Sequence, residues 1–202
     1  KEPKDVTFVY DFNGDTFVET VKMTSDGKFN FAGALPMEEV DVMIYVGSSP
    51  YGAHLKKGTT TVMAIGENAT FTGDNVAESK FFNKYIQAFY PLNYKPAGDA
   101  PFVFEDGKKL LESEKSQVNA LIPGVKDSLK DIYSRMANSY YDEVMLSLLG
   151  MDKAFNGVDH NAEMDEIISR VDPNADESRL TGILNYWYDK SEMLRQIQFL
   201  SI

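Results

Sequence analysis

The chain lacks cysteine altogether and has only two histidines and one tryptophan in 202 residues. Without cysteine, these residues can form no disulfide bond, thiol nucleophile or thiolate metal site. No apolar run approaches the roughly 20 residues that a membrane-spanning helix needs. Basic residues are outnumbered, with 20 Lys and Arg against 31 Asp and Glu, and the net charge of −11 disfavours nucleic acid and anionic lipid as partners.

The common signatures of nucleotide-binding and hydrolytic proteins are also missing. There is no Gly-x-Gly-x-x-Gly or Walker loop, and no Gly-x-Ser-x-Gly elbow. The two histidines, His54 and His160, lie far apart, and neither has a second histidine at metal-ligand spacing. We therefore expect no catalytic centre and no cofactor in this chain. A hydrolase in which His54 meets Ser48 or Ser49 is the remaining catalytic alternative.

Residues 1–74 predict a β-rich domain. Apolar and polar residues alternate over 6–12 and 16–23, with Asn13-Gly14-Asp15 between them as a hairpin turn. Further strands are expected at 28–33, 40–46, 60–65 and 69–72. Residues 47–52 are rich in Gly, Ser and Pro, which predicts an exposed loop. Short, closely spaced strands with glycine turns favour an antiparallel β-sandwich or a partly open barrel.

Residues 75–202 predict an α-helical domain, so the fold class is α+β. Apolar residues at spacings of three and four indicate helices over 75–90, 106–121, 125–149, 164–171 and 178–200. Asn75 is the expected N-cap of the first helix. The longest apolar stripe includes Leu129, Ile132, Met136 and Val144. These stripes are most simply explained as faces buried in a core.

Residues 152–163 have the spacing of a calcium-binding EF-hand loop. Asp152 stands first, Asn156 fifth, Val158 seventh, where a backbone carbonyl binds, and Glu163 twelfth, with glycine in sixth place. Ala154 replaces the third ligand, which would weaken calcium binding sharply. In the alternative, which these departures favour, the glycine ends one helix and Asp159 or Asn161 caps the next. We therefore predict no metal site but retain these four residues as candidates.

Four segments carry a resemblance to a known family. They are Asp-Gly-Lys-Phe-Asn-Phe-Ala-Gly at 26–33, Val-Met-Ile-Tyr-Val at 42–46, Gly-Thr-Thr-Thr-Val at 58–62 and Ala-Thr-Phe-Thr-Gly at 69–73. Over roughly residues 5–75 the chain resembles an amino-terminal domain of unknown function that is followed by a helical segment. This domain precedes thioredoxin-like domains in cell-envelope proteins of gut Bacteroidetes. Those proteins are thiol-disulfide oxidoreductases or relatives of alkyl hydroperoxide reductase and thiol-specific antioxidant proteins.

The resemblance implies a periplasmic or outer-membrane-anchored protein. A lipoprotein anchor on an upstream cysteine is expected, with residues 1–4 as the end of the tether, and Asp127-Ser128-Leu129 matches the family's O-glycosylation pattern at Ser128. The Cys-x-x-Cys motif is absent here, so no catalytic residue can be carried over from the family. A longer parent protein could nevertheless be a thiol-disulfide oxidoreductase.

These expectations lead to a non-catalytic accessory module of the cell envelope. It would position or dimerise a redox domain, or bind a client protein, through the sheet and the loop at 47–52. Its partners would then be a C-terminal thioredoxin-like domain, a client protein or a second copy of the chain. The alternative is a periplasmic small-ligand-binding protein with a pocket between sheet and helices, lined by Tyr85, Phe89 and Trp187.

Overall fold

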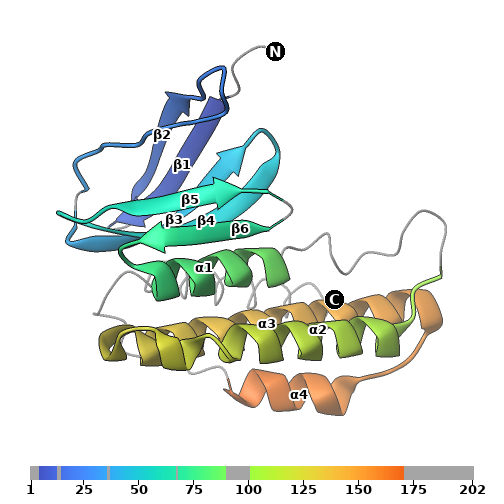
Figure 1. The fold of residues 1–202 in the computed structure, drawn as a ribbon. Coiled ribbons are helices and arrows are strands. Elements are labelled where there is room, and N and C mark those ends of the chain that lie inside the picture. Colours follow the sequence, from blue (N-terminus) through green and yellow to red (C-terminus); the bar gives the residue numbers. More distant parts are fainter. Residues whose placement is uncertain (1–4, 13–14, 36, 67, 90–100, 171–202) are drawn as a thin grey trace. The chain divides into compact units, whose positions relative to one another are not determined.

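The computed structural model describes residues 5–12, 15–35, 37–66, 68–89 and 101–170. The fold is α+β, as predicted, with antiparallel sheets that do not close into a barrel in the described part. The chain forms two compact units (Figure 1). Unit 1 comprises residues 1–87 and 121–127, and unit 2 comprises residues 88–120 and 128–202.

The main sheet of unit 1 has four antiparallel strands in the order β2-β1-β3-β4. The strands are β1 (Asp5–Phe12), β2 (Asp15–Lys22), β3 (Glu39–Val46) and β4 (Ser49–Lys56). A second, two-stranded sheet pairs β5 (Thr61–Ile65) with β6 (Ala69–Gly73), so that Val62 lies opposite Thr72. In β1 the period of two buries Val6, Phe8 and Tyr10 on one face, as the sequence predicts.

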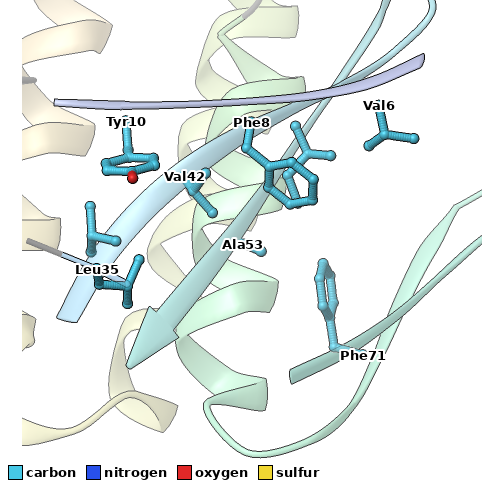
Figure 2. Packing of buried hydrophobic residues seen from close by; sticks show 9 residues of the cluster. Val6, Phe8, Tyr10, Leu35, Val42, Ala53 and Phe71 are labelled. Atoms are coloured by element: carbon cyan, nitrogen blue, oxygen red, sulfur yellow. The ribbon is translucent and has the colours of Figure 1, made fainter. Parts of the chain in front are cut away.

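The core of unit 1 lies on that face of the main sheet. In Figure 2 the side chains of Phe8, Val42 and Ala53 gather between the strands, and Phe71 of β6 points toward them. The nine buried members of this cluster are Val6, Phe8, Tyr10, Leu35, Val40, Val42, Ile44, Ala53 and Phe71. One aromatic side chain therefore brings the second sheet into the same core.

The strand expected at residues 28–33 is not formed. These residues run without regular structure, and their aromatic side chains pack on β1 instead. The Phe31 ring stacks on the Phe8 ring with centroids 4.4 Å apart, and Phe29 meets Phe8 edge to face at 6.0 Å. The alternation of this segment therefore reflects the partial burial of two aromatic rings and not strand pairing.

The loop expected at residues 47–52 is also corrected, because β4 begins at Ser49 and runs through it. Only the turn at Gly47, where φ is +65°, supports the loop prediction. Gly52 is buried against α1 (Val76–Ala88), and a Cβ atom there would lie 2.7 Å from the Phe82 ring. The glycine therefore allows a close approach of helix and strand, which composition alone reads as a loop.

The first helix begins where the sequence places it, but its cap differs from the prediction. The Asn75 carbonyl accepts the Ser79 N–H, while the Asn75 side chain donates to the Thr59 hydroxyl instead of capping α1. The change from strands to helices falls between Gly73 and Val76, close to the expected domain boundary at residue 74. By contacts, however, nearly all of α1 and residues 121–127 belong with the sheets.

Unit 2 consists of helices in its described part. They are α2 (Phe104–Asn119), α3 (Asp127–Asn156, whose first residue groups with unit 1) and α4 (Asn161–Arg170). The short 3-10 turn Ile122–Gly124 precedes α3 and groups with unit 1. The predicted stripe on α3 is confirmed, since Leu129, Ile132, Met136 and Val144 are buried. The helix continues to Asn156 rather than ending at 149. None of the described helices has the length and apolar character to cross a membrane. The helix expected at 178–200 lies outside the described residues.

Candidate functional site

A buried polar cluster in unit 1 is centred on His54. The side chain of His54 is completely buried on β4, directly opposite Asp41 of β3, which is 6% exposed. The His54 Nδ1 atom lies 2.8 Å from Asp41 Oδ1, and Nε2 lies 3.6 Å from Glu39 Oε2. Glu39 and Asp41 share one face of β3 because they are two residues apart. The pairing register of the hairpin thus places both carboxylates beside one imidazole.

Lys126 extends this cluster from the segment that precedes α3. Its ammonium group forms an ion pair with Glu39, and its backbone N–H donates to Glu78 Oε1 at 3.0 Å. Burial raises the pKa of Glu39. The hydrogen bond and positive charge of Lys126, together with His54, lower this pKa by more, so it is lowered overall. Burial lowers the pKa of His54, but the hydrogen bond that the ring donates to Asp41, together with the negative charges of Asp41 and Glu39, raises it by more, so the pKa is raised overall. Charges therefore alternate along the cluster, which limits the cost of burying them.

The backbone of His54 is fixed by two hydroxyl groups. The His54 N–H donates to Ser79 Oγ at 3.0 Å, and Thr61 Oγ1 donates to the His54 carbonyl at 3.3 Å. These bonds join β4 to α1 and to β5. The Ser79 hydroxyl thus serves the His54 backbone, because it also donates to the His54 carbonyl at 3.4 Å. The geometry is that of a buried structural joint.

The serine–histidine pair considered from the sequence is not formed by Ser49. Ser49 and His54 stand five residues apart in the same extended strand, a separation of roughly 16 Å at about 3.3 Å per residue. Ser48 lies in the exposed turn before that strand. Neither serine can activate its hydroxyl with the His54 ring in this arrangement, because proton transfer needs hydrogen-bond distance.

A second polar cluster, in unit 2, surrounds His160 between α3 and α4. The Nε2 atom of His160 lies 2.6 Å from Asp152 Oδ2, and Nδ1 lies 2.6 Å from Glu163 Oε2. Asn156 donates to Asp152 Oδ1 at 2.7 Å, and the Phe104 ring lies 4.9 Å from the imidazole ring. Burial lowers the pKa of His160, but its two carboxylate partners raise it more, and the pKa is raised overall.

This cluster occupies the place of the calcium-like loop. Asp152 and Asn156 lie in the last turns of α3, so the first five positions of the pattern are helical. Gly157, with φ of +71°, follows the helix, and Asp159 accepts the Asn161 N–H at the start of α4. The described residues contain no group of three acidic or histidine side chains arranged to hold a metal ion. The structure therefore matches the alternative in which Gly157 ends one helix and Asp159 caps the next.

Of the four candidate calcium residues, three come together around His160, whereas the Val158 side chain is exposed. The spacing of these residues therefore identified a real polar cluster, but this cluster surrounds the His160 ring and not a calcium ion. A usable signal was present, since His160 and Glu163 stand three residues apart at a helix start and therefore meet on one face.

The remaining predicted residues are those of the expected ligand pocket and of the expected glycosylation site. Tyr85 and Phe89 are both buried and belong to units 1 and 2, respectively, and Trp187 lies outside the described residues. Ser128, the expected glycosylation site, is exposed in the first turn of α3.

Comparisons of the chain with protein-family models, with curated proteins and with solved structures found no match.

Proposed function

We propose that this chain is a non-catalytic accessory module of the cell envelope, which positions a partner domain or a second copy of itself, or binds a client protein, through the main sheet. The envelope location and a thioredoxin-like partner follow from the family resemblance. The positions of the two histidines support the non-catalytic role, and the sheet order supports the choice of surface.

The observation that carries the proposal is the enclosure of the His54 ring. A general base must reach the proton that it abstracts, directly or through one water molecule. His54 has no exposed surface, and its two ring nitrogens face Asp41 and Glu39. A similar arrangement holds the second histidine, since both nitrogens of His160 face carboxylates at 2.6 Å. Both histidines are therefore explained by structural roles.

The surface that best fits a binding role is the outer edge of β2. This strand is at the end of the sheet order and pairs with β1 alone within the described residues. Its residues alternate between half-buried and exposed, and Val18 is 62% exposed. An edge strand presents backbone N–H and C=O groups to which another chain can add a strand. This edge replaces the 47–52 segment as the proposed interaction surface.

The experiment measures binding at this edge. Sedimentation velocity of the chain over a hundredfold concentration range reports self-association, and NMR titration with a thioredoxin-fold oxidoreductase domain reports partner binding. Val18→Lys places a charge on the edge strand, which disfavours strand addition. Val62→Lys, at a 50% exposed valine of β5, is the matched control.

The proposal expects association in at least one of the two assays, weakened at least tenfold by Val18→Lys and unchanged by Val62→Lys. Association that both variants leave intact would remove the β2 edge, and absence of association in both assays would remove the binding role. Turnover of an ester, phosphate or glycoside substrate that is lost in His54→Ala would overturn the non-catalytic assignment.

A further inference from the structure

The middle of β2 lacks the features that usually keep an edge strand from pairing with another chain. Protected edge strands are commonly very short, interrupted by a β-bulge, or marked by proline or lysine. β2 is eight residues long, contains no proline and pairs one-to-one with β1 from Asp15 to Lys22, at the end of the sheet in Figure 1. Lys22, its last residue, is bound to Asp5 at 2.5 Å. Glu19, its central charge, accepts a hydrogen bond from Tyr10 of β1 at 2.7 Å and is thereby held away from the edge.

The two hairpins of the main sheet indicate which backbone groups of β2 face the open edge. Two residues separate Phe12 from Asp15, and two separate Val46 from Ser49. The residues that flank a two-residue turn form a hydrogen-bonded pair, and such pairs alternate along an antiparallel ladder. From the first turn, even-numbered residues of β1 bond to β2 and odd-numbered ones to β3. From the second turn, odd-numbered residues of β3 bond to β1, which agrees because the odd-numbered residues of β1 and β3 stand opposite each other.

The open edge therefore belongs to the even-numbered residues of β2. Among the described residues, no other segment takes up the backbone N–H and C=O groups of Thr16, Val18 and Thr20. Their side chains lie on the outer face of the sheet, where Thr16 donates to Asp11 at 2.5 Å and Thr20 lies 3.4 Å from the Thr7 hydroxyl. Val18 remains 62% exposed. The edge thus presents unpaired peptide groups on both sides of one exposed valine.

Most ways of pairing this edge with a copy of itself are unfavourable. In an antiparallel pair with a two-fold axis, both copies keep the same face toward the core, so residues of equal parity stand opposite each other. Like charges placed directly opposite destabilise such a pair. An axis at Phe17 places Asp15 opposite Glu19 of the second copy, and an axis at Glu19 opposes the two Glu19 side chains. An axis at Thr20 pairs only residues 18–22 of β2.

We propose that β2 pairs antiparallel with β2 of a second copy of the chain, with the two Val18 residues opposite each other on a two-fold axis. Residues 15–21 of the two strands then overlap, and no like charges stand opposite each other. Val18 pairs with Val18, and Thr16 pairs with Thr20 of the second copy, each pair exchanging two backbone hydrogen bonds. The two four-stranded sheets become one continuous sheet. The choice of edge rests on the proposed function, and the partner is now specified as the chain itself.

Single cysteines test this pairing in the full chain, which has no cysteine of its own. The Cα atoms of a hydrogen-bonded antiparallel pair are about 5.5 Å apart, within the roughly 4.4–6.8 Å that a disulfide spans. Val18→Cys should therefore form disulfide-linked dimers under mild oxidation. Val62→Cys, at a 50% exposed valine of β5, is the matched control for random collision.

A mixture of two variants tests the register separately and serves if Val18→Cys fails to fold. Thr16→Cys and Thr20→Cys should form mixed dimers, which mass spectrometry identifies when one variant is labelled with ¹⁵N. Thr20→Cys alone should not form dimers, because its two copies are offset by four residues, about 13 Å along the strands.

Val18→Cys is expected to give at least tenfold more dimer than Val62→Cys at equal protein concentration, and the mixed dimers should exceed both homodimers at least tenfold. Dimers of Thr20→Cys alone at the yield of Val18→Cys would overturn the register. Equal yields from Val18→Cys and Val62→Cys, with no mixed dimers, would overturn pairing with a second copy. In that case, β2 amide shifts on titration with a thioredoxin-fold domain would preserve the proposed function, and their absence would remove both proposals.

Discussion

Replacing Gly52 with alanine tests how closely α1 packs on β4. The added Cβ atom would lie 2.7 Å from Phe82 Cδ1, 2.8 Å from the Phe82 carbonyl oxygen and 2.9 Å from its carbonyl carbon. Two of these three atoms are backbone, so a change of side-chain rotamer cannot relieve the contact. Helix and strand must therefore separate by several tenths of an ångström.

The cost can be estimated from the contacts that this separation breaks. Inserting a methyl group into a packed site costs about 1–3 kcal/mol. The Gly52 N–H also donates to Asn83 Oδ1 at 3.1 Å in a buried position, and leaving such a donor unpaired costs about 1–3 kcal/mol. We expect Gly52→Ala to lower the free energy of unfolding of unit 1 by about 2–6 kcal/mol, a large part of the usual total of about 5–15 kcal/mol.

Urea unfolding followed by circular dichroism measures this change. Because the chain has two compact units, two transitions can occur, and amide hydrogen exchange identifies the one that contains β3 and β4. Gly124→Ala is the control, since no atom lies within 4 Å of a Cβ at that position and its φ is not positive. A Gly52→Ala variant within about 0.5 kcal/mol of the parent chain would refute the reasoning on close packing.

Three further predictions concern the two histidine clusters. NMR titration should give His54 and His160 pKa values above the unfolded value of about 6.5. The stability that each charged histidine contributes is then complete below about pH 6.5 and is lost as the pH rises through the raised pKa. A pKa at or below about 6.5 for either histidine would contradict this. Asp41→Asn should destabilise unit 1 by about 3 kcal/mol in urea unfolding and lower the His54 pKa. The control, Asp26→Asn at an exposed ion pair, should change the stability little. Equal losses of stability in the two variants would count against a buried ion pair. Gly157→Ala should cost about 1–2 kcal/mol because φ is +71°, and millimolar calcium should leave the melting temperature and the His160 resonances unchanged; a calcium-dependent rise in melting temperature would favour the EF-hand interpretation.

The periodic elements were the easiest to predict, because a helix or strand with one buried face has apolar residues at a regular spacing in the sequence. The alternation around Phe8 and the stripe through Leu129 and Met136 both identified their elements and their buried faces. The boundaries were less accurate, and α3 extends seven residues beyond its expected end at 149. The end of α3 was missed because polar residues around Asp152 are hydrogen-bonded to one another and interrupt the apolar pattern of the helix.

Two segments were misjudged because the same composition serves two purposes. Phe29 and Phe31 alternate like strand residues, yet they fill the space over Phe8 without pairing. Gly52 belongs to a segment whose composition predicts an exposed loop, but this glycine allows Phe82 of α1 to approach β4 closely. In both cases the deciding contact is with a residue distant in sequence, which no local pattern contains.

Residue type and local period were sufficient to predict the fold class, five of the six described strands, the four described α-helices and the absence of thiol side chains, but they missed β4 and added a strand at 28–33. The tertiary structure alone decided which charges meet. It placed His54 between Asp41 and Glu39 with Lys126 beyond, and His160 between Asp152 and Glu163. It also placed the Lys115 ammonium group over the Tyr141 ring. Electrostatic partnerships of this kind depend on strand register and helix packing across distances that sequence spacing does not encode.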